Sequence, residues 1–143
     1  MPALPSNLTA YKRVTIAAPG AGADWTLTVP AGKSWLLYAV YAVLVQGATQ
    51  TPQPILFLDD GTNNLMESIG STGAQSASTT CAYSWAAGMV QTAQVGSGAG
   101  VHSNAPIPDG LVLPTGFRIR SSTLGIGANS QWGIPSAFVA ELG

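Results

Sequence analysis

The segment Asp24–Val45, DWTLTVPAGKSWLLYAVYAVLV, constrains the fold more than any other part of the chain. In its first part Trp25, Leu27 and Val29 alternate with threonines, so they share one face of an extended strand. Pro-Ala-Gly then predicts a tight turn, because proline presets φ and glycine supplies a positive φ. Aromatic and β-branched residues fill the part after the turn, and no helix cap flanks it. The whole segment therefore predicts a strand, a turn and a longer strand.

The longer strand is apolar on both faces, which leaves two interpretations open. It is either a central strand covered on both sides within the domain, or a strand with one face in the core and the other at a subunit interface. Regular alternation predicts one face with Trp35, Leu37, Ala39, Tyr41, Val43 and Val45, and an opposite face with Leu36, Tyr38, Val40, Ala42 and Leu44.

A partial copy of this pattern occurs in Leu111–Ser121, LVLPTGFRIRS, which repeats L-x-[VL]-P-x-G before a strand. The strand of the copy has a polar side, because Ile119 alternates with Arg118 and Arg120. The first strand has no such polar side. This difference favours the face of Leu36–Leu44 that carries Tyr38 as the subunit contact.

Seventeen glycines and ten prolines punctuate the other apolar runs of the 143-residue chain. This spacing predicts about eight to ten short strands and no helix. The expected fold is all-β, an antiparallel β-sandwich of jelly-roll-like type. We expect residues 1–10 to form an extended N-terminal arm and residues 11–143 a single β-sandwich domain. The Gly-rich stretch Gln91–Ala105 is predicted to be a long mobile loop.

Charged residues make up only 8% of the chain, against about 25% in a typical soluble domain. A surface with so little charge suits a protein that is held against other protein. The net charge of −1 offers no basic patch for nucleic acid. No apolar run predicts a membrane-spanning helix. The N-terminus lacks the pattern of a signal peptide, so we expect synthesis in a cytoplasm without Sec export.

Few residues suggest chemistry, and the sequence predicts no catalytic, cofactor-binding or metal site. The single histidine, His102, lies in the Gly-rich stretch with no evident partner for base catalysis. The single cysteine, Cys81, fits a small buried hydrophobe. The run 59–64 contains oxygen ligands that suit calcium, but it lacks the alternating pattern of a calcium loop, and an ordinary Asp- and Asn-rich turn explains it without a metal. The possible cation ligands in that run are Asp59, Asp60, Asn63 and Asn64.

Three motifs together resemble those of small structural proteins of tailed bacteriophages. They are LTVPAGKSWLLYAVYAVLV, PILFLDDGTNNLM and LVLPTGFRIR. These virion proteins are of jelly-roll or related β-sandwich type and include capsid decoration (cement) proteins. The resemblance implies a non-enzymatic virion protein that sits on the capsid surface after assembly in the host bacterial cytoplasm. It also implies contact with the major capsid protein at capsomer junctions and self-association, as a homotrimer.

The residues expected at such interfaces come from four parts of the chain. They are Pro2, Leu4 and Pro5 of the arm, Tyr38, Val40 and Leu44 of the long strand, His102, and the outward arginines Arg118 and Arg120. The alternative function is a receptor- or carbohydrate-binding β-sandwich module of a tail or fibre, in which loops and aromatic side chains face a glycan.

Overall fold

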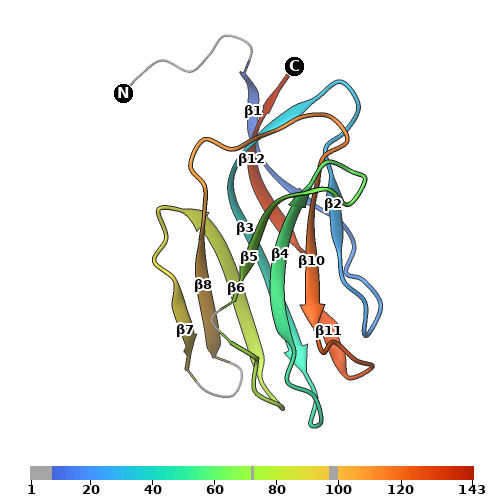
Figure 1. Ribbon diagram of the computed structural model, residues 1–143, viewed down its shortest axis with the longest axis vertical. Coiled ribbons are helices and arrows are strands. Elements are labelled where there is room, and N and C mark those ends of the chain that lie inside the picture. The colour runs from blue at the N-terminus through green and yellow to red at the C-terminus, as the bar shows by residue number, and fades with distance from the viewer. Residues whose placement is uncertain (1–7, 72, 97–99) are drawn as a thin grey trace.

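The computed structural model describes residues 8–71, 73–96 and 100–143 and shows two β-sheets packed face to face (Figure 1). No helix occurs among these residues, which confirms the predicted all-β sandwich. The larger sheet has the order β1-β12-β3-β6-β8-β7, with β9 and β11 also paired to β3, and the smaller sheet has the order β2-β10-β4-β5. The strands of the larger sheet are β1 (Leu8–Thr15), β3 (Ser34–Gln46), β6 (Thr80–Ala87), β7 (Thr92–Val95), β8 (Val101–Ile107), β9 (Val112–Leu113), β11 (Ser130–Trp132) and β12 (Ser136–Leu142). Those of the smaller sheet are β2 (Thr26–Thr28), β4 (Gln53–Asp59), β5 (Leu65–Gly70) and β10 (Arg118–Leu124).

The strand pairing is nested, as the jelly-roll prediction requires. β1 pairs with β12, β2 with β10, β3 with β6 and β4 with β5, and each of these pairs is antiparallel. In sequence each pair encloses the next, and successive pairs alternate between the two sheets, which is the arrangement of a jelly roll. The strands β7 and β8 extend the larger sheet beyond β6, and β8 runs parallel to β6.

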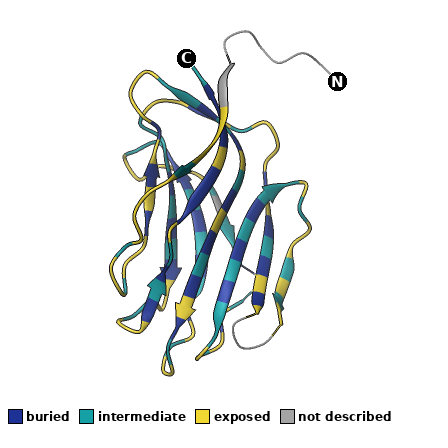
Figure 2. Cartoon of the chain, turned by 180° about the vertical axis from the view of Figure 1, so that it is seen from behind, coloured by how far each residue is buried: buried dark blue, intermediate teal, exposed yellow. Residues whose placement is uncertain are grey.

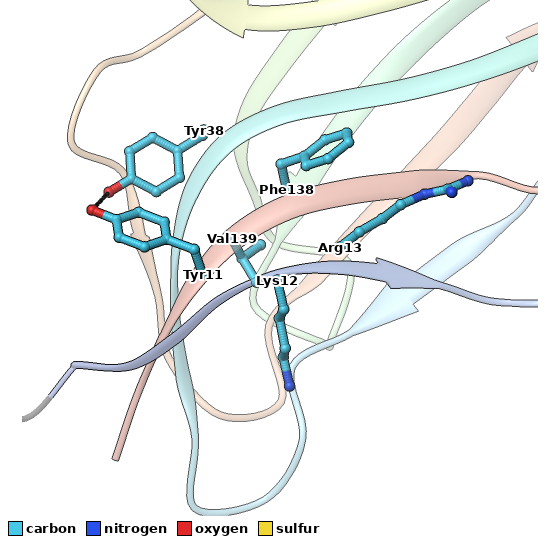
Figure 3. A pocket seen from close by; sticks show the side chains of 6 residues that line it. All are labelled: Tyr11, Lys12, Arg13, Tyr38, Phe138 and Val139. Carbon is cyan, nitrogen blue, oxygen red and sulfur yellow. Dashed lines mark hydrogen bonds between the residues drawn. The ribbon is translucent and has the colours of Figure 1, made fainter.

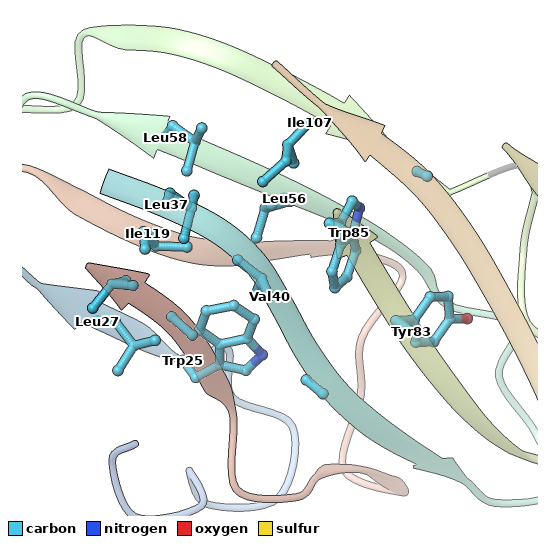
Figure 4. Packing of buried hydrophobic residues seen from close by; sticks show 14 of the residues in the cluster. Trp25, Leu27, Leu37, Val40, Leu56, Leu58, Tyr83, Trp85, Ile107 and Ile119 are labelled. Atoms are coloured by element: carbon cyan, nitrogen blue, oxygen red, sulfur yellow. The ribbon is translucent and has the colours of Figure 1, made fainter. Parts of the chain in front are cut away.

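The core lies between the sheets, and Figure 4 shows Trp25 and Trp85 within it. It contains all four tryptophans. Trp25 meets Trp132 edge-on with ring centroids 6.2 Å apart, and Tyr83 stacks on Trp85 at 5.8 Å. The four tryptophans and Tyr83 thus pack inside the domain, where large rings bury much apolar area.

The repeated turn motif forms two adjacent turns of the same kind. The amide of Lys33 donates to the carbonyl of Pro30, and the amide of Phe117 donates to that of Pro114. Gly32 and Gly116 take φ values of 73° and 84°, a region that favours glycine. The sequence repeat therefore reflects two equivalent turns, one entering β3 and the other entering β10.

The long strand β3 departs from regular alternation, so the predicted assignment of its faces is wrong after Leu37. Opposite β12, Leu37 pairs with Val139 and Ala39 pairs with Phe138, which leaves Tyr38 as an extra residue in a β-bulge. Because one inserted residue reverses which positions face inward, the later core positions are the even-numbered ones. Banding of buried and exposed positions is visible along the larger sheet in Figure 2.

Two predictions about irregular segments also need correction. Residues 8–10 of the predicted arm belong to the first strand, because β1 begins at Leu8 and both Leu8 and Ala10 pair with β12. Residues 1–7 of the predicted arm lie outside the described residues. The stretch Gln91–Ala105 is not one long loop, because it contains β7 and most of β8, which pair with each other at the sheet edge.

Candidate binding surface

The side chains that could take part in catalysis or metal binding lie far apart in the fold. Within residues 8–71, 73–96 and 100–143, no group of three or more histidine, cysteine, aspartate or glutamate side chains is placed to hold a metal ion. His102 is exposed on β8. Cys81 is buried in the core, and burial raises the pKa of its thiol.

The oxygen-rich run 59–64 forms a self-contained turn. The carboxylate of Asp60 accepts hydrogen bonds from Thr62 N at 2.8 Å, Thr62 Oγ1 at 2.7 Å and Asn64 Nδ2 at 2.8 Å. These donors hold the pKa of Asp60 well below its usual value. Asn63 Oδ1 accepts from Arg118 Nη2 at 2.8 Å. The turn therefore uses internally the oxygens that a cation would need, as an Asx turn does.

The predicted outward arginines of β10 are engaged within the chain. Arg118 Nε and Arg120 Nε lie 2.7 Å and 2.6 Å from the two carboxylate oxygens of Asp59, whose side chain is fully buried. Burial raises the pKa of Asp59, but the hydrogen bonds from the two arginines outweigh this effect and hold the pKa at about 2. Arg120 also lies over the ring of Phe57, 4.8 Å from the centroid. These contacts account for both arginines as parts of the outer face of the smaller sheet.

The outer face of the larger sheet carries four exposed aromatic rings. They are Tyr11 (53% exposed), Tyr38 (36%), Tyr41 (41%) and Phe138 (46%), and we call them the aromatic face. With about 200 Å² for each ring, they expose roughly 350 Å². A patch of that size is at the scale of the largest apolar patches on monomers, which are often functional.

The bulge in β3 creates this face. Without the extra residue at Tyr38, two tyrosines three positions apart would point to opposite sides of the sheet. With it, both rings lie outside. Tyr38 Oη donates a hydrogen bond to Tyr11 Oη at 3.1 Å, and this bond raises the pKa of Tyr38. The ring centroids of the pair are 5.4 Å apart (Figure 3).

A groove of about 490 Å³ continues the aromatic face across β12, β3 and β6. Tyr41, Phe138 and Met89 are among its walls, and Ala39 and Ala86 contribute small side chains. Its charged side chain is Arg13 of β1. The same arginine borders a second hollow beside the tyrosine pair (Figure 3).

The structure separates the predicted interface residues into different places. Tyr38 is on the aromatic face, and His102 is exposed farther along the same sheet, beside Ala82 in the ladder. Val40 and Leu44 are both 0% exposed in the core, so their predicted outward position is wrong, and the bulge is the reason. The other predicted residues are Arg118 and Arg120 on the opposite sheet, and Pro2, Leu4 and Pro5, which lie outside the described residues.

Sequence reasoning missed Arg13, Tyr41 and Phe138 as surface residues that come together. The two tyrosines of the long strand, Tyr38 and Tyr41, carried one signal. Tyrosine hydroxyls usually bind water or a polar partner, which favours an exposed position for both rings. No local pattern indicates the contact between β1 and β12, which joins residues more than 120 positions apart.

Comparison with known proteins adds a single structural likeness. The scan against protein-family models and the search of curated proteins found no match. The search of solved structures found a chain in a structure of infectious bursal disease virus, Gt strain, at 10% sequence identity and a TM-score of 0.34. The match covers 99% of this chain but only 38% of that one. No functional argument rests on a likeness of this size.

The described residues contain no helix that is long and apolar enough to cross a membrane.

Proposed function

We propose that this protein is a virion structural protein, specifically a phage capsid decoration protein that binds the shell through its aromatic face. The observation that carries the proposal is the roughly 350 Å² of aromatic surface that one sheet leaves uncovered. Tyrosine and phenylalanine are enriched in the buried centres of protein interfaces. The low charge of the chain and the phage-like turn motifs support the same function.

The physical role would be to stabilise the shell by burying apolar surface between capsid subunits. At about 25 cal/mol per Å², covering 350 Å² contributes roughly 9 kcal/mol before the costs of association. A standard interface buries about 800 Å² on each partner. The aromatic face is therefore large enough to be the apolar centre of such an interface. In this proposal the protein attaches as a homotrimer to the major capsid protein at capsomer junctions.

Co-sedimentation with cognate capsids assembled without this protein tests the proposal. Tyr41→Glu places a charge on the aromatic face, and we expect it to reduce capsid binding at least tenfold while the protein stays folded. Leu124→Glu is the matched control, because Leu124 is 57% exposed but belongs to β10 of the other sheet. The proposal is wrong if the wild-type protein ignores capsids, or if both variants bind as the wild type does. Sedimentation velocity of the free protein tests the trimer.

A carbohydrate- or receptor-binding role on a tail or fibre is the second candidate, favoured by the aromatic groove beside Arg13. Aromatic side chains in shallow grooves can stack on sugar rings, and a few polar groups then orient the ligand. Retention of the protein on a polysaccharide column, together with failure to bind capsids, would support this role over decoration.

A further inference from the structure

Arg13 is held in a fixed position, but no carboxylate of the described residues forms an ion pair with it. Its Nε donates to Ser136 Oγ at 2.9 Å, and Ser136 is buried at 1% exposure. In the ladder Arg13 lies opposite Phe138, so the guanidinium lies along the aromatic face (Figure 3). Among the described residues, no acceptor pairs with its two terminal nitrogens.

The other basic residues contrast with it. Arg118 and Arg120 share the carboxylate of Asp59. Lys12 lies 2.6 Å from Glu141, and Lys33 donates to the carbonyl of Gly143 at 2.9 Å. Arg13 is thus the basic side chain of the described chain that retains unsatisfied charge-assisted donors next to an apolar surface.

The exposed carboxylate of Asp109 lies near enough to Tyr38 to raise the pKa of that residue, but no acidic residue lines the groove beside Arg13. Glu141 is the single acidic residue in the sequences of β1, β3, β6, β7, β8 and β12. Its carboxylate is bound by Lys12 and by Trp35 Nε1, which donates at 3.1 Å from a buried ring. The groove is therefore an apolar trough with one positive end.

We infer that this groove binds a segment of a partner protein in which a carboxylate stands next to an apolar side chain, with Arg13 as the ligand of the carboxylate. Arginine offers two parallel N–H donors in the geometry that a carboxylate accepts. An apolar side chain of the same segment would lie between Tyr41 and Phe138 over the small residues of the groove.

A second copy of this chain is a poorer occupant of the same groove. In a symmetric contact Arg13 would need an acid from the same face of the other copy. The carboxylate of Glu141 is already held by Lys12 and Trp35, and the exposed Asp109 does not line the groove. Charge complementarity therefore favours an acidic partner segment. The inference rests on the proposed use of the aromatic face as a binding surface, and it specifies the chemistry of the partner.

Two small probes that differ only in charge test the inference on the isolated protein. N-acetylphenylalanine carries a ring and a carboxylate, and N-acetylphenylalanine amide carries the same ring without the charge. In a titration followed by amide chemical shifts, we expect shifts at Ala39 and Ala86 with both probes. The carboxylate should bind at least about tenfold more tightly, as one charge-assisted hydrogen-bond pair predicts.

Arg13→Gln should abolish this preference and leave weak binding of both probes. Lys33→Gln removes the same charge from a turn outside the groove and should keep the preference. Arg13→Lys keeps the charge without the bidentate geometry and should give an intermediate preference. Unchanged spectra outside the groove will show that each variant is folded.

Equal affinity for the two probes, or a preference that survives Arg13→Gln, overturns the inference. So does binding of glucuronate in place of the aromatic acid, because the site would then be a sugar-acid site. Self-association through Tyr41 with no response to either probe overturns it in favour of a second copy. A capsid-binding wild type whose Arg13→Gln variant binds equally well keeps the proposed function and rejects this inference. Selective binding of the carboxylate probe without any capsid binding keeps this inference and rejects the proposed function.

Discussion

Val40→Ala tests the most consequential feature of the fold, the reversal of side-chain alternation in β3. The side chain of Val40 is 0% exposed and belongs to the core. Removing two buried carbons costs about 1.6 kcal/mol at about 0.8 kcal/mol per methylene group. The cavity left behind adds about 1 kcal/mol. We therefore expect the free energy of unfolding to fall by about 2–3 kcal/mol and the Tm to fall by roughly 5–10 °C.

Tyr41→Ala is the matched control one position along the strand. Its ring is 41% exposed on the aromatic face, so we expect a loss below about 1 kcal/mol. Urea unfolding followed by tryptophan fluorescence suits both variants, because all four tryptophans are buried. The denaturant dependence of the unfolding free energy should be the same in both proteins, so that the difference in midpoint reports stability alone.

A larger loss of unfolding free energy in Tyr41→Ala than in Val40→Ala would refute the bulge. If β3 alternated regularly through Tyr38, Tyr41 would share the inner face with Leu37, and Val40 would face outward. Tyr41→Ala would then be the more destabilising substitution, and Val40→Ala would be close to neutral. Equal and large losses for both would mean that both faces of the strand are covered in solution.

The sequence carried enough information for the fold class because its strongest signals are local. The Pro-x-Gly motifs before Lys33 and Phe117 place a positive φ where glycine tolerates it, and both turns form. The alternation of Trp25 and Leu27 requires one buried face, and both residues are buried. Each of these features is decided by residues within a few positions of one another.

The candidate surface was much less predictable because distant residues decide it. Whether Tyr38 is an extra residue depends on the register between β3 and β12, and these strands are almost 100 positions apart in the chain. A bulge moves every later side chain to the other face, so one unseen irregularity misplaced Val40 and Leu44 together. The position of Arg13 likewise depends on the pairing of the first strand with the last.

Three further changes probe the register, the loops and the charges. Deletion of Tyr38 removes the unpaired bulge residue, so the protein should stay folded and lose less than about 2 kcal/mol of unfolding free energy. Deletion of Val43 shifts a regular ladder and should unfold the protein. Circular dichroism distinguishes the two outcomes. Gln75→Ala should cost about 2–3 kcal/mol and speed hydrogen exchange in residues 73–79, because its buried amide donates to two backbone carbonyls at 2.9 Å. Asp59→Asn should destabilise the protein by about 3 kcal/mol at pH 7, because it leaves two arginines without their carboxylate. The pKa of Asp59 is lowered from 3.8 to about 2, so its ionised form stabilises the folded state fully above about pH 4 and loses that contribution as the pH falls through 2. Denaturation at a series of pH values should therefore show the wild-type advantage over Asp59→Asn shrinking by about 2 kcal/mol between pH 5 and pH 2. An advantage that stays constant over this range would mean that the two arginines do not stabilise the ionised carboxylate.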